Sequence, residues 1–315
     1  MSWLSTGVTL ILAGLFLREL ATVLLARVPT QTRAVMVGDN APLCQDEIPR
    51  IIWTYWQPTP APAFIQACLA NWRRFAPDHE VRLLDRDSVM SWLPDLRADF
   101  DTLPADRQAD WLRIQLLARH GGIWMDASML LSRDLGWLHE TRRRRTADYV
   151  GFYIDRYTTR PELPLLDSGL MASVPGGRFA ASLALAFDLA LDEGAESLLQ
   201  RLQRDGRHAR VVQALPDALQ HGLPLQMAAS DVLDRTPQLA RLVLLRAEDG
   251  PLAWQAGVRW RPRHLYARLA LAPCPRMLPA VLKLRDDDRA VVERNWRRGL
   301  VSPFSALVQL VTRSK

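Results

Sequence analysis

Hydrophobic and polar positions first follow the order expected for an α/β fold at residues 48–84. β-branched and aromatic residues fill 51–55 and 80–84, and each run predicts a buried strand. Between them, apolar side chains three and four positions apart over 61–76 predict an amphipathic helix. A short helix is expected at 88–93. Strand, helix, strand and helix in this order are typical of a parallel sheet.

The same kind of pattern continues through the rest of the chain. Further strands are expected at 123–125, 149–154 and 169–173. Helices are expected at 108–120, 178–203, 210–221, 229–235 and 286–298. The chain shows no internal repeat and no low-complexity tract.

The N-terminal residues 1–28 are predicted to form a hydrophobic helix, interrupted by Arg18 and Glu19. Two alternatives stay open: attachment to a membrane, spanning it or lying at its surface, or packing on the folded domain. If the helix spans, Arg27 and Arg33 behind it place the main domain in the cytoplasm.

The remaining boundaries follow from composition. Residues 29–47 are polar and contain Pro29 and Gly38, which predicts a linker. The catalytic domain is expected over 48–299, and an apolar tail or helix over 300–315.

Composition and charge exclude several classes of protein. The 315 residues carry a formal charge of +6, almost entirely from arginine, and the three cysteines lack CxxC spacing. Neither a disulfide framework nor a zinc site is indicated, and a reducing compartment is expected. The four arginines at 142–145 are expected on a solvated loop. With no wider basic face and no known module, nucleic-acid binding is not expected.

Candidate chemistry begins in the predicted helix 108–120. Apolar residues cover most of its circumference, so it is expected to be largely buried. Asp110 and Arg113 lie three positions apart and share one face. Two charges on a buried helix must pair with each other or face a ligand, because an uncompensated buried charge is costly.

A second candidate group follows this helix. Gly121 and Gly122 allow a tight turn, and the strand 123–125 then delivers Asp126 at its carboxyl end, where α/β sheets bind ligands. Ser128 lies two positions later, on the same side if the strand continues. These two oxygen ligands suit Mg²⁺ or Mn²⁺ bound to a diphosphate. The alternative is that Asp126 only caps a turn.

Three separated motifs now occur in order: IPRIIWTYW (48–56), PDHEVRLLD (77–85) and ADWLRIQLLARHGGIWMDAS (109–128). Together they resemble the capsular polysaccharide synthesis family of bacterial glycosyltransferases, which is related to glycosyltransferases with a DXD sugar-binding region. The resemblance covers about residues 48–175 well and the remainder loosely. It implies a GT-A type, Rossmann-like nucleotide-sugar-binding domain, here with additional C-terminal helices, and usually a divalent cation.

The resemblance also implies roles for single residues. Trp53, Thr54 and Tyr55 would border the nucleotide, and Gly121 and Gly122 would give the donor access to backbone. Asp110 and Arg113 match the SDxxR element that contacts the donor. Asp126 matches the first DXD acid, the anchor of metal and diphosphate. Here Ser128 replaces the second acid, which predicts weaker metal binding through Asp126 and Ser128.

Two later segments add candidates. Asp167 and Ser168 resemble a family strand that borders the sugar and acceptor, although the family's tryptophan is missing. Lys283 resembles a C-terminal lysine near the diphosphate, and a surface lysine is the alternative. Asp110, Asp126 and Asp167 are thus the candidate catalytic carboxylates.

The expected function is transfer of a sugar from a nucleotide sugar to a saccharide or glycolipid acceptor in bacterial capsule or lipopolysaccharide synthesis. Retention of configuration and assistance by Mn²⁺ or Mg²⁺ are expected. The expected location is the cytoplasmic face of the inner membrane, or the cytoplasm. One alternative is a non-catalytic, membrane-associated protein of the same fold that binds nucleotide sugars. The other is a basic peripheral protein that binds anionic lipid or nucleic acid.

Overall fold

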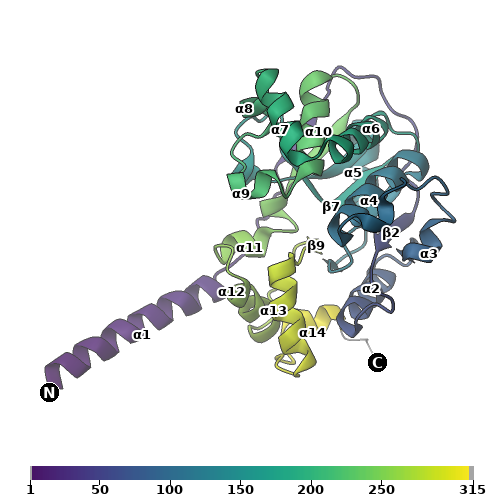
Figure 1. Ribbon diagram of the computed structural model, residues 1–315. Coiled ribbons are helices and arrows are strands. Elements are labelled where there is room, and N and C mark those ends of the chain that lie inside the picture. Colours follow the sequence, from purple (N-terminus) through teal and green to yellow (C-terminus); the bar gives the residue numbers. More distant parts are fainter. Residues whose placement is uncertain (1, 312–315) are drawn as a thin grey trace.

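The computed structural model describes residues 2–311 and contains a mixed sheet of seven strands (Figure 1). The strand order is β1-β8-β6-β7-β4-β2-β3. The strands of this sheet are β1 (Ala34–Val37), β2 (Ile51–Tyr55), β3 (Glu80–Leu84), β4 (Gly122–Met125), β6 (Tyr149–Tyr153), β7 (Leu166–Ser173) and β8 (Leu242–Arg246). A two-stranded antiparallel sheet joins β5 (Leu130–Leu131) to β9 (Val281–Leu282).

The α/β class is confirmed, but the sheet is not wholly parallel. β2 pairs in parallel with β3 and β4, and β6 pairs in parallel with β8. β7 is antiparallel to both β4 and β6, and β1 is antiparallel to β8. The connection from β6 to β7 carries only a short 3₁₀ turn, Asp155–Tyr157, and not the helix that usually crosses over between parallel strands.

Helices cover both faces of the sheet (Figure 1). Neighbouring strand residues alternate between the two cores: Ile52 and Ile123 pack with α2 and α14, while Trp53 and Trp124 pack with α4, α6 and α10. The helices in the folded body are α2 (Ala63–Phe75), α3 (Arg86–Val89), α4 (Ala105–His120), α5 (Gly136–Arg145), α6 (Arg178–Glu193), α7 (Ala195–Arg204), α8 (His208–Val211), α9 (Asp217–Gln220), α10 (Pro224–Arg235), α11 (Ala253–Gly257), α12 (Pro262–Tyr266), α13 (Asp286–Arg297) and α14 (Ala306–Val311).

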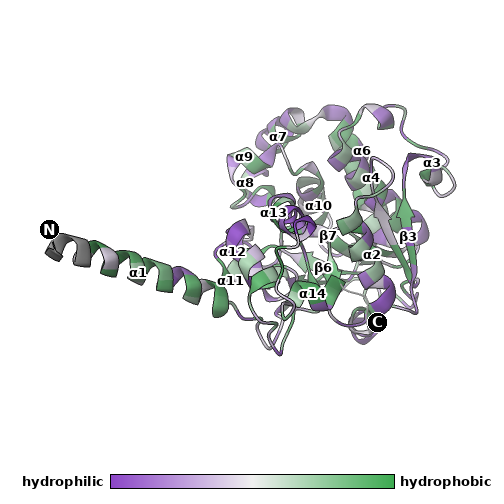
Figure 2. Ribbon diagram, turned by 90° about the horizontal axis from the view of Figure 1, so that it is seen from below, coloured by the Kyte–Doolittle hydropathy of each residue, from purple (hydrophilic) through white to green (hydrophobic). Residues whose placement is uncertain are grey.

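The N-terminal helix α1 (Ser2–Leu24) projects away from the folded body, and its surface is largely apolar (Figures 1 and 2). Residues 8–18 are exposed. Its base is attached where Glu19 accepts from His264 at 2.7 Å and pairs with Arg261. The segment Gly7–Leu24 is long and apolar enough to cross a membrane. Packing along the domain is therefore limited to its last turns.

Other segments depart from the predicted pattern. The expected linker 29–47 contains β1, an edge strand of the sheet, because its AVMV run pairs with β8. The arginines at 142–145 end helix α5, and Arg142 is buried, donating to the carbonyl of Cys44. The long helix at 178–203 is broken at Gly194, where φ is 79°.

The C-terminal segment packs into the core through α14, whose Ala306, Leu307 and Leu310 are buried. Residues 312–315 of the expected tail lie outside the described residues.

Candidate functional site

A cleft of about 760 Å³ opens at the carboxyl ends of the parallel strands β2 and β4. Ligands bind at this edge in α/β sheets, which makes the cleft the candidate site. Helix α4, Leu219, Leu223 and residues 283–289, which follow β9 and begin α13, also line it. Six of the residues predicted from sequence line it: Tyr55, Asp110, Arg113, Asp126, Ser128 and Lys283.

Arg113 of α4 joins the two predicted acids. Its Nη2 lies 3.2 Å from Oδ1 of Asp110 and 3.3 Å from Oδ1 of Asp126. Its Nη1 donates to the carbonyl of Ser168 at 2.5 Å, and its guanidinium lies 5.0 Å from the ring centroid of Trp124. The expected pair of Asp110 and Arg113 on one helix face is therefore formed. Arg113 also contacts Asp126, which follows β4.

Asp110 lines this cleft but is itself almost completely buried. Burial raises the pKa of its carboxyl, while Arg113 and Arg107 act in the opposite direction. Nη1 of Arg107 lies 3.1 Å from Oδ2, so each carboxylate oxygen of Asp110 faces a cation. Without these partners, a buried carboxylate would be strongly destabilising.

Lys283 enters the cleft directly after β9. Its Nζ lies 2.6 Å from Oδ1 of Asp167 and 3.8 Å from Oδ2 of Asp126. Burial lowers the pKa of the ammonium, but the two carboxylates outweigh this effect and raise it. Asp167 is buried, and it holds Lys283 in place. The alternative of a surface lysine is wrong, because the Lys283 side chain is only 15% exposed.

Ser168 points away from the cleft. It is buried, and its hydroxyl accepts a hydrogen bond from Nε2 of Gln226 at 3.0 Å. Its carbonyl is already bound to Arg113. The structure thus gives Ser168 a role in holding Arg113, and its predicted contact with the sugar finds no support in this geometry.

Trp53, Thr54, Gly121 and Gly122 have structural explanations that involve no ligand. Trp53 is fully buried and donates to the carbonyl of Gly121 at 2.8 Å, and Thr54 is fully buried as well. A Cβ on Gly121 would lie 2.5 Å from the backbone nitrogen of Pro175, and one on Gly122 would lie 2.9 Å from the carbonyl oxygen of Ile51. Gly121 precedes β4 and Gly122 begins it, whereas the cleft lies at the other end of this strand, so their predicted contact with a donor is not supported.

The side chains at Asp126 and Ser128 do not fit a divalent ion well. The Ser128 hydroxyl donates to the carbonyl of Leu284 at 2.9 Å, and Oδ1 of Asp126 accepts from Nε1 of Trp124 at 3.1 Å. An ion roughly 2.1 Å from Oδ2 of Asp126 would lie no farther than about 6 Å from the Lys283 ammonium. At such a distance the ion and the ammonium would repel each other by several kcal/mol. Two unit charges 4 Å apart near a protein surface, for comparison, repel by roughly 4 kcal/mol.

The described residues offer no further support for an ion. Residues 2–311 contain no group of three or more His, Cys, Asp or Glu side chains placed to bind a metal. The metal predicted at Asp126 and Ser128 thus has no matching set of ligands among the described residues.

A family of known proteins matches the part of the chain that contains most of the site. The family described as "Capsular polysaccharide synthesis protein" matches residues 30–143, the part that contains Asp110, Arg113 and Asp126. The chain is therefore similar to that family over this part of its length.

One curated relative is the O-glycosyltransferase braB of Annulohypoxylon truncatum, 28% identical over 147 residues. The alignment covers 41% of this chain and 34% of the relative, so the chain matches about a third of that protein's length. Among solved structures, the PaToxG glycosyltransferase aligns over 61% of this chain and 89% of its own, with 11% identity and a TM-score of 0.33.

Sequence reasoning missed several side chains that line the cleft, among them Trp56, Arg285 and Arg289. The guanidinium of Arg289 lies 5.1 Å from the ring centroid of Trp56, and the buried Nε1 of Trp56 has no hydrogen-bond partner among the described residues. Trp56 ends the IPRIIWTYW motif, so its position after the strand was the available signal. Arg285 is held by Asp288, which is fully buried and whose Oδ2 lies 2.8 Å from Nε of Arg285.

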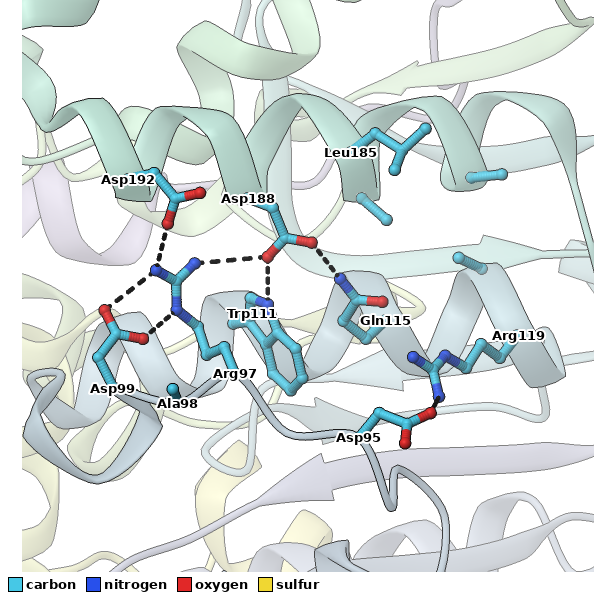
Figure 3. A pocket seen from close by; sticks show the side chains of 13 residues that line it. Asp95, Arg97, Ala98, Asp99, Trp111, Gln115, Arg119, Leu185, Asp188 and Asp192 are labelled. Carbon is cyan, nitrogen blue, oxygen red and sulfur yellow. Dashed lines mark hydrogen bonds and ion pairs between the residues drawn. The ribbon is translucent and has the colours of Figure 1, made fainter.

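A second hollow, of about 830 Å³, lies on the outer side of α4 and α6 (Figure 3). Its polar groups bind one another: Arg97 pairs with Asp99, Asp188 and Asp192. Trp111 donates to Asp188 at 2.6 Å. Because these charges are compensated within the surface, the hollow lacks the convergent groups of the cleft at β4, and we assign it a structural role.

Proposed function

We propose that this chain is a glycosyltransferase of the hexosyltransferase class with a GT-A type domain. It transfers a sugar from a nucleotide-sugar donor to a saccharide or glycolipid acceptor in bacterial surface polysaccharide synthesis. The observation that carries the proposal is the convergence of Asp126, Arg113 and Lys283 in one cleft at the carboxyl ends of β2 and β4. The family match and the glycosyltransferase name of the curated relative support the same activity.

The cleft contains the groups that such a transfer needs. The bond between the sugar's anomeric carbon and the diphosphate oxygen breaks, and its electron pair leaves with the diphosphate. The acceptor hydroxyl oxygen bonds to that carbon, and its proton passes to the released diphosphate. Arg113 and Lys283 supply positive charge where negative charge develops, which is the main way in which enzymes stabilise such a step.

The remaining side chains orient the donor. Asp110 and Asp126 present carboxylate oxygens to sugar or ribose hydroxyls, and Tyr55 and Trp56 form an aromatic wall for a flat base. We propose retention of anomeric configuration, which the resemblance to DXD relatives supports. We also propose that α1 attaches the enzyme to the cytoplasmic face of the membrane, which its length and hydropathy support.

The test is Asp126→Asn in the detergent-purified full-length chain, assayed for hydrolysis of a panel of UDP and GDP sugars. We expect turnover to fall at least 100-fold, because the carboxylate that binds Arg113 and faces Lys283 is lost. The control is Asp95→Asn, which removes an exposed carboxylate beside Arg119 in the second hollow. Asp126→Asn turnover equal to that of the wild type would contradict the proposal. Tight binding of a nucleotide sugar by the wild type, without turnover, would favour the non-catalytic binding protein.

A further inference from the structure

Lys283 lies between the Asp126 carboxylate, which lines the cleft, and the buried carboxylate of Asp167. Its ammonium lies 2.6 Å from Asp167 and 3.8 Å from Asp126, and Asp167 contacts it from the buried side. Within residues 2–311, the ammonium donates one hydrogen bond, to Asp167. A lysine ammonium has three donors, so two remain for a ligand in the cleft.

The surroundings are shaped for this side chain. Gly169 leaves the space that Lys283 fills, since a Cβ there would lie 2.6 Å from Nζ, 2.8 Å from Cε and 3.0 Å from Cδ. The backbone is held as well, because the amide of Lys283 donates to the carbonyl of Pro251 at 3.0 Å and its carbonyl accepts from Gln255. Only two of the chain's 40 basic residues are lysines, Lys283 and Lys315. A compact ammonium fits here, whereas the wider guanidinium of arginine would need more room.

Asp126 therefore lies between two positively charged side chains, Arg113 and Lys283. Arg113 faces Oδ1 at 3.3 Å, and Lys283 faces Oδ2. In a metal-dependent site, a carboxylate in this position would hold a divalent ion against the diphosphate. Here the hydroxyl of Ser128, the second predicted ligand, donates to the Leu284 carbonyl. The ammonium of Lys283 occupies the neighbouring space.

We propose that Lys283 is the built-in cation of this cleft: held by Asp167 and Asp126, its ammonium binds the diphosphate of the donor without a divalent ion. This inference rests on the proposed function, because it requires a nucleoside diphosphate in the cleft. Arg113 contacts the same diphosphate from the opposite side of Asp126.

The experiment measures calorimetric binding of UDP and GDP to the detergent-purified full-length chain, once in EDTA and once in MnCl₂. The wild type should bind one nucleotide with dissociation constants that agree within twofold in the two conditions. Lys283→Met should weaken binding in EDTA at least tenfold. MnCl₂ should restore part of that loss, because Asp126 and Asp167 are then free to bind an ion. Arg119→Met, which removes an exposed positive charge beside Asp95, should match the wild type.

A second variant guards against loss of folding. Lys283→Met leaves Asp167 buried without its cation, whereas Lys283→Met combined with Asp167→Asn removes both charges. The double variant should fold and should show the same tenfold loss in EDTA. Wild-type binding that disappears in EDTA and returns with MnCl₂ would overturn the inference and leave the glycosyltransferase proposal intact. Absence of nucleotide binding in both conditions would overturn both.

Discussion

The side chain of Lys283 passes directly over the backbone of Gly169, so that a Cβ at residue 169 would lie 2.6 Å from the ammonium nitrogen. Gly169 lies in the buried strand β7, and its carbonyl accepts from the amide of Asp126 at 2.9 Å. One position of β7 therefore supports both Asp126 and Lys283. No feature of the local sequence indicates this, because Lys283 is 114 positions farther along the chain.

Gly169→Ala is expected to weaken nucleotide binding in a chain that still folds. The new methyl group pushes Lys283 away from Asp167, and nucleotide binding in EDTA should weaken about as much as in Lys283→Met. The melting temperature should fall as well, because Asp167 loses its close contact with the ammonium, but by less than in Lys283→Met, in which the ammonium is absent. Titration calorimetry and thermal unfolding measure the two effects.

The control for this change is Gly176→Ala. Gly176 has open space around its Cβ position but a φ of 63°, so the substitution strains the backbone and meets no side chain. It should lower the melting temperature and leave nucleotide binding unchanged. If Gly169→Ala binds nucleotide as the wild type does, Lys283 does not need this space.

Trp53 is buried in the core, whereas Trp56, only three positions later, lines the cleft. Trp53→Phe removes a buried hydrogen bond to the carbonyl of Gly121 and leaves a void. A buried carbonyl left unpaired costs about 1–3 kcal/mol, so the free energy of unfolding should fall by at least that amount. The KM for the donor should not change.

Trp56→Phe is the matched comparison. Trp56 lines the cleft, and its Nε1 has no partner among the described residues, so stability should change little and the donor KM should rise several-fold. Denaturant titration and initial-rate kinetics on both variants provide the check. A raised KM in Trp53→Phe with normal stability would reverse these assignments.

The predictions that succeeded rest on local patterns. The spacing of Asp110 and Arg113 places them on one helix face, and the strand before Asp126 sets it at the edge of the sheet, so both were identified from short segments. The resemblance predicts that Trp53, Gly121 and Gly122 contact the donor, but they lie against each other and against Ile51 and Pro175.

What the sequence could not show depends on contacts between distant segments. The strand β1 is recognisable only through its pairing with β8, more than 200 residues later. Asp167 contacts Lys283, which lies 116 positions farther along the chain, and no local pattern links the two. The mixed parallel and antiparallel pairing of the sheet also depends on distant segments. The direction in which two strands pair is set by the connection between them, and the apolar pattern of a single strand does not show it.

A truncation is expected to separate the two parts of α1. Removing residues 1–17 takes away the exposed apolar part and leaves Glu19 bound to Arg261 and His264. This variant should keep the melting temperature of the full chain and no longer float with lipid vesicles on a density gradient. Removing residues 1–28 should lower the melting temperature, since the buried Ala26 and the Ala26 carbonyl that accepts from Arg268 are then lost. Flotation of the shorter truncation with vesicles would place membrane contact elsewhere.

The pair His79 and His139 is expected to make stability depend on pH. Their Nε2 atoms share a hydrogen bond of 2.9 Å, and burial lowers the pKa of each imidazole from its ordinary value of 6.5 to about 4. Arg50 lowers the pKa of both further, while Asp134 opposes this effect at His79. The unfolded chain therefore binds protons that the folded chain does not between about pH 6.5 and pH 4.

Stability should be complete above pH 6.5 and should fall as the pH drops toward 4, by about 1.4 kcal/mol per pH unit for each imidazole that gains a proton only on unfolding. Chemical denaturation at half-unit pH steps measures this slope. His139→Asn removes one titrating group and should flatten the slope, even though its stability at pH 7 is lower because His79 loses its partner. His221→Asn, an exposed histidine beside Glu196, should keep the wild-type slope. A His139→Asn slope equal to that of the wild type would mean that carboxylates elsewhere, and not this buried pair, control the loss of stability in acid.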